Sequence, residues 1–264
     1  MTNVKRSRSV RNGIEVFKLR SWRDFYPFIT QTLKDPQEFI FRGQRMSTWP
    51  LESSLDRAIK ELGPGVNSAR LTARHLEQFQ LAARARRGTN PQPLDEQGRW
   101  ALGQHYGLWT PLLDWTESPF VALYFAFEEP NRLGKPARAV FALCRPLVEL
   151  RCESITKGLP LDSPARPDIV EFITPKTDEN ARLVSQGGLF TRGTTGISIE
   201  EWVSTHFSGK GDRVLIKIVV PEKRSDRFDI LRTLNQMNIS HRSLFPDVEG
   251  SAKFCNLRLS VPEY

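Results

Sequence analysis

Alternating and continuous apolar patterns divide the chain into short strands. Residues 14–19 alternate between apolar and polar side chains as a half-buried strand does, and residues 214–220 show the strongest strand pattern. Apolar residues at 39–41 and at 112–116 predict two further strands. The pattern at 254–261 predicts a last strand at the C-terminus.

Helical spacing and capping residues predict helices between these strands. Ser21 as a cap and Asp35-Pro36 as a stop predict a helix over residues 22–33. Apolar side chains at helical spacing predict another over 68–87. Ser118 and Pro119 predict the start of an apolar helix that ends near Phe127. A Ser oxygen can accept a free backbone N–H there, and Pro has none to satisfy.

The order of these elements predicts the fold class. Strands and helices interleave without a regular β-α-β rhythm, so we expect a single α+β domain. The first 13 residues contain four Lys or Arg and no acid, which indicates a basic, flexible arm over 1–13 before a domain over 14–264. A separate domain from about residue 145 is the alternative.

The charge of the chain favours an anionic partner. Among 264 residues, 38 Lys and Arg oppose 30 Asp and Glu, a formal net charge of +8. Residues 70–87 contain a single acid, Glu77, so this helix is either a solvated charged face or a surface that contacts RNA or DNA. The arginines in question are Arg70, Arg74, Arg84, Arg86 and Arg87.

Cysteine and histidine content argues against several classes of protein. Three cysteines without a CxxC pair indicate neither a disulfide framework nor a zinc site, which fits a reducing cytoplasm. We therefore expect a cytoplasmic protein without metal. The longest apolar run, 120–127, is far below the ~20 residues of a membrane span, so no membrane partner is expected. Four histidines without a cluster disfavour a metal-dependent nuclease.

The stretch IFRGQ, residues 40–44, places an arginine at the end of an apolar strand. A guanidinium can bind a phosphate or carboxylate through two parallel hydrogen bonds, and Gly43 would let a ligand approach the backbone. Arg42 is therefore a candidate anchor for a phosphate-bearing ligand. The alternative is that Arg42 forms an ion pair with Asp114.

Several motifs together resemble the FRG-domain family. They are IFRGQ, SSLDR at 53–57, GQHYGLWTPLLDWTESPFVALYFAF at 103–127 and SLFPDVEG at 243–250, in the same order as in the family. Trp109 and Pro111 stand where the family pattern has Pro and Arg. The family in turn is similar to ADP-ribosyltransferases of the Arg/Ser/Glu type. This resemblance implies a mixed, split β-sheet flanked by helices, with NAD as co-substrate.

The resemblance also implies roles for particular residues. Arg42, with Gly43 and Gln44, would hold the dinucleotide, and Thr116 with Ser118 would lie under the nicotinamide ribose. A late carboxylate, Glu249 or Asp247, would stabilise the oxocarbenium-like ribose that forms when nicotinamide leaves. Further cofactor contacts are expected from three residues, His105, Asp114 and Gln186.

Simpler interpretations of the same residues remain open. Thr116 and Ser118 could cap the helix that starts at Pro119, and His105 could be a core residue. Asp247 could belong to a turn.

The expected function is that of an NAD-dependent ADP-ribosyltransferase. Its acceptor would be a nucleic acid, and the resemblance suggests a toxin or phage-defence effector, with an antitoxin protein as a further partner. A non-catalytic nucleotide or nucleic-acid binding module and an NAD glycohydrolase are the alternatives.

Overall fold

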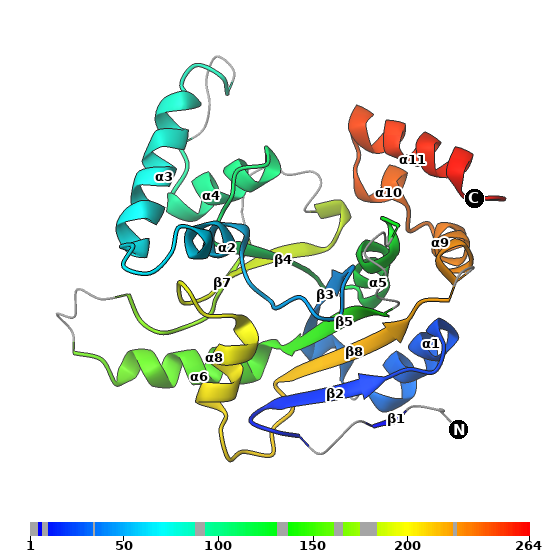
Figure 1. The fold of residues 1–264 in the computed structure, drawn as a ribbon, viewed down its shortest axis with the longest axis horizontal. Helices are drawn as coiled ribbons and strands as arrows, with labels where there is room; N and C mark the ends of the chain where they lie inside the picture. The colour runs from blue at the N-terminus through cyan, green and yellow to red at the C-terminus, as the bar shows by residue number, and fades with distance from the viewer. Residues whose placement is uncertain are drawn as a thin grey trace.

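One mixed sheet organises the computed structural model (Figure 1), as the α+β expectation required. Residues 5–6, 10–33, 35–87, 93–130, 137–160, 166–174, 184–223 and 226–264 are described, and within them the sheet has eight strands in the order β1-β2-β8-β5-β3-β4-β7-β6. The strands are β1 Lys5–Arg6, β2 Ile14–Lys18, β3 Phe39–Gln44, β4 Leu112–Thr116, β5 Ala137–Cys144, β6 Glu171–Ile173, β7 Gly188–Arg192 and β8 Leu215–Pro221.

The sheet is split between β3 and β4. These neighbours share one residue pair, Phe41 with Thr116. By contrast, β3 pairs with β5 over six residues and β4 pairs with β7 over five. All of these pairs are antiparallel, whereas β2 and β8 run parallel. The two halves of the sheet therefore diverge on either side of Phe41.

Helices cover both faces of the sheet (Figure 1). One hydrophobic cluster contains side chains of α1, α5 and α9 on one face, and a second contains side chains of α6 and α8 on the other. A smaller cluster lies beneath α2, α3 and α4. The helical segments are η1 Trp22–Asp24, α1 Phe25–Pro27, η2 Phe28–Thr32, η3 Pro36–Glu38, α2 Ser54–Glu61, α3 Ser68–Ala82, α4 Glu96–His105, α5 Pro119–Phe127, α6 Arg145–Lys157, α8 Ile199–His206, α9 Asp226–Gln236, α10 His241–Leu244 and α11 Val248–Ser260.

The predicted C-terminal strand at 254–261 was wrong, because this segment belongs to α11. Phe254, Leu257 and Val261 also fit a helical spacing, and the last two are buried. Leu259, which alternation would place on the buried side with Leu257, is 91% exposed. Asp247 accepts a hydrogen bond from the backbone N–H of Gly250 at 2.7 Å, which fixes the helix start.

Part of the predicted N-terminal arm joins the sheet. Lys5 and Arg6 pair antiparallel with Lys18 and Phe17 at the edge of the sheet. Residues 1–4 and 7–9 of the predicted arm lie outside the described residues. No helix in the described part of the chain has the length and apolar character needed to span a membrane.

Candidate functional site

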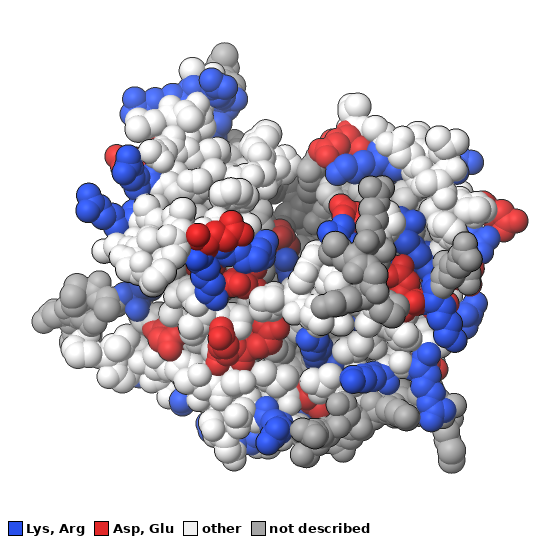
Figure 2. All heavy atoms as spheres, in the orientation of Figure 1, with Lys and Arg blue, Asp and Glu red and all other residues white. Residues whose placement is uncertain are grey.

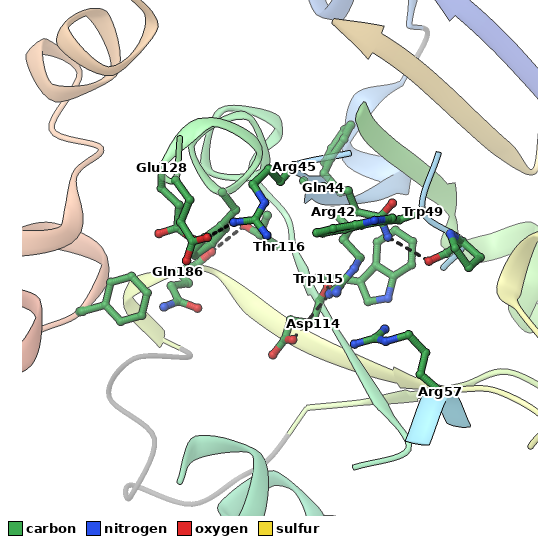
Figure 3. Close-up of a pocket in the computed structure, with 16 residues that line it drawn as sticks. Arg42, Gln44, Arg45, Trp49, Arg57, Asp114, Trp115, Thr116, Glu128 and Gln186 are labelled. Carbon is green, nitrogen blue, oxygen red and sulfur yellow. Dashed lines mark hydrogen bonds and ion pairs between the residues drawn. The ribbon is translucent and has the colours of Figure 1, made fainter. Parts of the chain in front are cut away.

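A cavity of about 680 Å³ lies beside the split between β3 and β4 (Figure 3). Figure 2 shows the hollow near the middle of the face, between the part formed by α3 and α4 and the part formed by α10 and α11. Its walls combine cations, carboxylates, aromatic rings and amides. The polar lining residues are Arg42, Gln44, Arg45, Arg57, Asp114, Thr116, Glu128, Glu129 and Gln186, and the aromatic ones include Trp49, Trp115, Phe125 and Phe245.

Arg42 reaches across the split from β3 to β4. Its Nη1 donates to the backbone oxygen of Asp114 at 2.6 Å and lies 3.5 Å from the Asp114 carboxylate. Burial lowers the pKa of Arg42 and the Asp114 charge opposes that shift, but an arginine keeps its charge in either case. The ion pair considered from the sequence is therefore present, on the wall of the cavity.

Two polar atoms on this wall have no partner among the described residues. They are the Nε of Arg42, a donor, and the Oε1 of Gln44, an acceptor. The two residues are two positions apart on β3, so they point to the same face of the sheet. Both atoms are shielded from solvent, so a ligand in the cavity would bond to them only after one of these side chains turns.

Gly43 lines the cavity as expected for a site residue, and its missing side chain also serves packing on the opposite side of β3. A Cβ placed on Gly43 would lie 1.9 Å from the backbone oxygen of Ala122 in α5. Glycine thus lets the backbone of α5 pack directly on β3 at this position. The motif combines a packing glycine on one face of β3 with two polar side chains that line the cavity on the other.

Thr116 and Gln186 also line the cavity, and each is tied into the fold. Thr116 Oγ1 donates to the backbone oxygen of Gln186 at 2.6 Å, and the side-chain amide of Gln186 donates to the Leu244 oxygen at 3.2 Å. These bonds join β4, the turn before β7 and α10. Both residues shape the wall near Phe245.

Four residues expected in the site do not line the cavity. Ser118 caps α5 by accepting from the Val121 N–H at 3.3 Å, as the capping interpretation predicted. The His105 ring packs against Tyr106 at the end of α4, with centroids 4.8 Å apart. Asp247 caps α11, and Glu249 pairs with Lys253 at 2.9 Å on the surface of the same helix.

The acidic groups at the far side of the cavity are Glu128 and Glu129, which no motif in the sequence indicated. Burial raises the pKa of Glu128 to about 7, and the charge of Glu129 adds to the effect. Glu129 forms an ion pair with Arg45. The sequence does contain a signal for this position. The helix α5 is apolar on nearly every side, so acids that directly follow it lie at the edge of the core.

The end of α5 is held by two arginines. Arg138 is fully buried and pairs with Glu222 at 2.7 Å. It also donates to the backbone oxygen of Glu129 at 2.8 Å. Arg227 donates to the Phe127 oxygen at 3.0 Å. The two guanidinium groups bond to backbone carbonyls at the end of the helix, which would otherwise repel a neighbouring carboxylate. These bonds hold Glu128 in place although its surroundings disfavour the ionised carboxylate.

His241 lies behind Glu128. Its Nε2 is 3.4 Å from a Glu128 oxygen, and its Nδ1 contacts the hydroxyl of Tyr124. Burial lowers the pKa of His241 to about 4. Between about pH 4 and pH 7, both partners are therefore mainly neutral.

The arginines expected to contact nucleic acid lie elsewhere. Arg70 and Arg74 are exposed on α3, and Arg84 and Arg86 are exposed just after it, whereas Arg87 is half-buried. None of the five lines the cavity.

Comparison with known proteins identifies one domain. Residues 37–134 match the family model described as the FRG domain, which confirms the expected resemblance over this stretch. The matched stretch includes Arg42, Asp114 and Glu128, whereas Gln186 and Phe245 lie outside it. No curated protein and no solved structure matches the chain.

Proposed function

From the FRG domain at residues 37–134, we propose that the chain is an NAD-dependent ADP-ribosyltransferase with a nucleic acid as acceptor. The observation that carries the proposal is the wall formed by Arg42 and Gln44. The side chains of both residues line a cavity that also contains the half-buried carboxylate of Glu128. The similarity of the family to ADP-ribosyltransferases supplies the reaction class.

The cavity suits a nucleotide in size and charge. Ligand sites commonly enclose about 300–1,000 Å³, and this one has about 680 Å³. Arg42 and Arg57 approach one part of it, and Glu128 lies with Arg45 at another (Figure 3). Arg42 and Arg57 would hold the pyrophosphate, because guanidinium groups bind phosphate oxygens bidentately.

An aromatic side chain beside the arginines could hold a base. Trp49 is 40% exposed at the cavity, and the Arg45 guanidinium lies 5.3 Å from the centre of its ring. An exposed indole next to cations favours stacking of a nucleotide ring.

Glu128 would act at the ribose. The bond between C1′ of the ribose and the nicotinamide nitrogen breaks, and its electron pair neutralises the positive pyridinium ring. A carboxylate beside C1′ stabilises the resulting oxocarbenium-like charge. The acceptor then forms a new bond to C1′ and gives up a proton.

The raised pKa of Glu128 fits the second part of this reaction. A general base works best when its pKa lies near the working pH, and the pKa of Glu128 is about 7. Ionised Glu128 can accept the proton of the incoming acceptor. Activity is accordingly expected to rise with pH through about 7.

The test follows the adenylate half of NAD. Full-length protein is incubated with NAD carrying a labelled adenylate, together with RNA, DNA or cell protein in separate reactions. Label on one polymer, lost in Arg42→Ala and Glu128→Gln, would support transfer to that acceptor class. Glu249→Gln should retain transfer if Glu128 supplies the carboxylate, and should lose it if the late acidic motif does.

The other outcomes identify the rival functions. Free ADP-ribose without labelled polymer would indicate a glycohydrolase, in which water attacks C1′. Intact NAD in every reaction would refute the enzymatic proposal. Binding of nucleotide that depends on Arg42 would then point to a non-catalytic module.

A further inference from the structure

Four arginines on α3 and directly after it lack acidic partners. Across the described residues, no carboxylate pairs with Arg70, Arg74, Arg84 or Arg86. Figure 2 shows Lys and Arg gathered over the part of the surface formed by α3. Unpaired guanidinium groups in water remain available for phosphates.

The fold aligns these arginines along one side of the helix. Thr72 and Leu76 are buried toward the body of the protein, while Arg70 and Arg74 are four residues apart and share the opposite, exposed side. Arg84 and Arg86 continue the exposed basic surface beyond the end of α3. Phosphates of an extended strand could contact several of these side chains in succession.

Two large aromatic side chains stand exposed in the turn between α4 and β4. Tyr106 is 74% exposed and Trp109 is 59% exposed. A ring nitrogen of His75, on α3, lies 3.0 Å from the backbone oxygen of Trp109, which fastens this turn to the basic helix. Trp109 is also one of the two positions where the chain departs from the family pattern.

The turn leads directly into the cavity wall. Asp114 follows Trp109 by five positions, so their Cα atoms are at most about 18 Å apart, and Asp114 lines the cavity. A polymer bound along α3 and the turn would thus pass close to the site. Exposed aromatics beside a basic track are the recurring features of surfaces that bind single strands, since unpaired bases can stack on the rings.

We propose that α3 and the turn at residues 106–111 form a docking surface for single-stranded nucleic acid. Arginines bind its phosphates, Trp109 and Tyr106 stack on its bases, and an unpaired nucleotide enters the cavity. The inference rests on the proposed function, because it identifies the acceptor class for that cavity. A duplex would fit poorly, since its bases are already stacked on one another.

The experiment measures binding without NAD, so that it is separate from catalysis. Fluorescence anisotropy with the full chain compares labelled 20-nucleotide single strands of RNA and DNA with the matching duplexes. Trp109→Ala should weaken single-strand binding roughly five- to a hundredfold, with recovery in Trp109→Phe. Tyr26→Ala removes an aromatic that is equally exposed on another surface, and it should leave binding unchanged.

Salt dependence tests the arginines. Each phosphate contact on a single strand contributes about 0.7 to the slope of log affinity against log salt, so the double variant Arg70→Gln/Arg74→Gln should lower the slope by about 1.4. Arg258→Gln, on the exposed side of α11, is the matched control. Trp109→Ala should weaken binding without changing the slope.

Three results would overturn the inference: equal or tighter binding of duplex, an effect of Trp109→Ala no larger than that of Tyr26→Ala, or no single-strand binding at low salt. Preference for RNA or for DNA would decide which single strand is the acceptor. If single strands bind as expected and NAD stays intact in their presence, the proposed function fails while the docking surface stands.

Discussion

Replacing Glu128 by Gln is expected to stabilise the protein at pH 8. Glu128 lies at the end of α5 with its side chain 24% exposed, and its pKa rises from an ordinary 4.5 to about 7. Between these values the folded protein holds a proton that the unfolded chain has released. The free energy of unfolding therefore falls as pH rises from about 4.5 to about 7.

The size of the effect follows from the same pKa. A rise from 4.5 to about 7 corresponds to about 3 kcal/mol above pH 7, at about 1.4 kcal/mol for each tenfold change in proton affinity. Glutamine has the shape of the protonated acid and no charge to desolvate. Glu128→Gln should thus gain about 3 kcal/mol at pH 8 but only about 1 kcal/mol at pH 5.

His241 acts in the opposite direction. Its pKa falls from 6.5 to about 4, so the unfolded chain binds the extra proton and stability is lost as pH falls from about 6.5 to about 4. In the parent protein the two contributions offset each other over much of this range. In Glu128→Gln the histidine contribution remains alone, and stability should rise with pH from 4 to 6.5.

Urea unfolding at pH 5, 6.5 and 8 measures these differences. Glu249→Gln, on the exposed side of α11, should change stability by less than about 0.5 kcal/mol at each pH. A Glu128→Gln protein that is less stable than the parent at pH 8, or whose gain is the same at pH 5 and pH 8, would refute the reasoning.

Two further predictions concern the packing and capping of helices. Gly43→Ala should destabilise the protein by roughly 3 kcal/mol or more in urea unfolding, because the new methyl group would overlap the backbone oxygen of Ala122. The control is Gly211→Ala, whose methyl group would meet no atom within 4 Å. It should change stability by less than about 1 kcal/mol. Asp247→Ala should lower the free energy of unfolding by about 1 kcal/mol, because it removes the cap of α11. NAD-dependent labelling should stay intact. Loss of labelling in a folded Asp247→Ala protein would show that Asp247 takes part in the reaction.

The strands that carry the site could be predicted from the sequence because each has a short apolar pattern with clear limits. β3, β4 and β8 lie where apolar runs or alternation placed them, and Ser118 begins α5 as its capping chemistry required. The segment at 254–261 fits two periods: Leu257, Leu259 and Val261 alternate as in a strand, whereas Phe254, Leu257 and Val261 recur as in a helix. Contacts with the rest of the fold, which no local pattern contains, decided between them.

Part of the cavity lining was predicted, where residues belong to the strands beside the split. Arg42, Gln44, Asp114 and Thr116 were expected and lie on one cavity. Glu128 was not selected, because its position depends on where the far end of α5 meets the cavity. That meeting is set by the packing of the helix on Gly43, a long-range contact rather than a motif.

The single residue pair between β3 and β4 has a consequence for the evolution of chains that contain this domain. Each of these strands has its full partner, β5 or β7, beyond residue 134, so the matched stretch supplies most of the cavity lining but does not complete the sheet. Gln186 and Phe245, which complete the lining, come from later segments. A lineage could keep the recognisable lining and replace the later segments, acquiring new substrates while its signature motif stays the same.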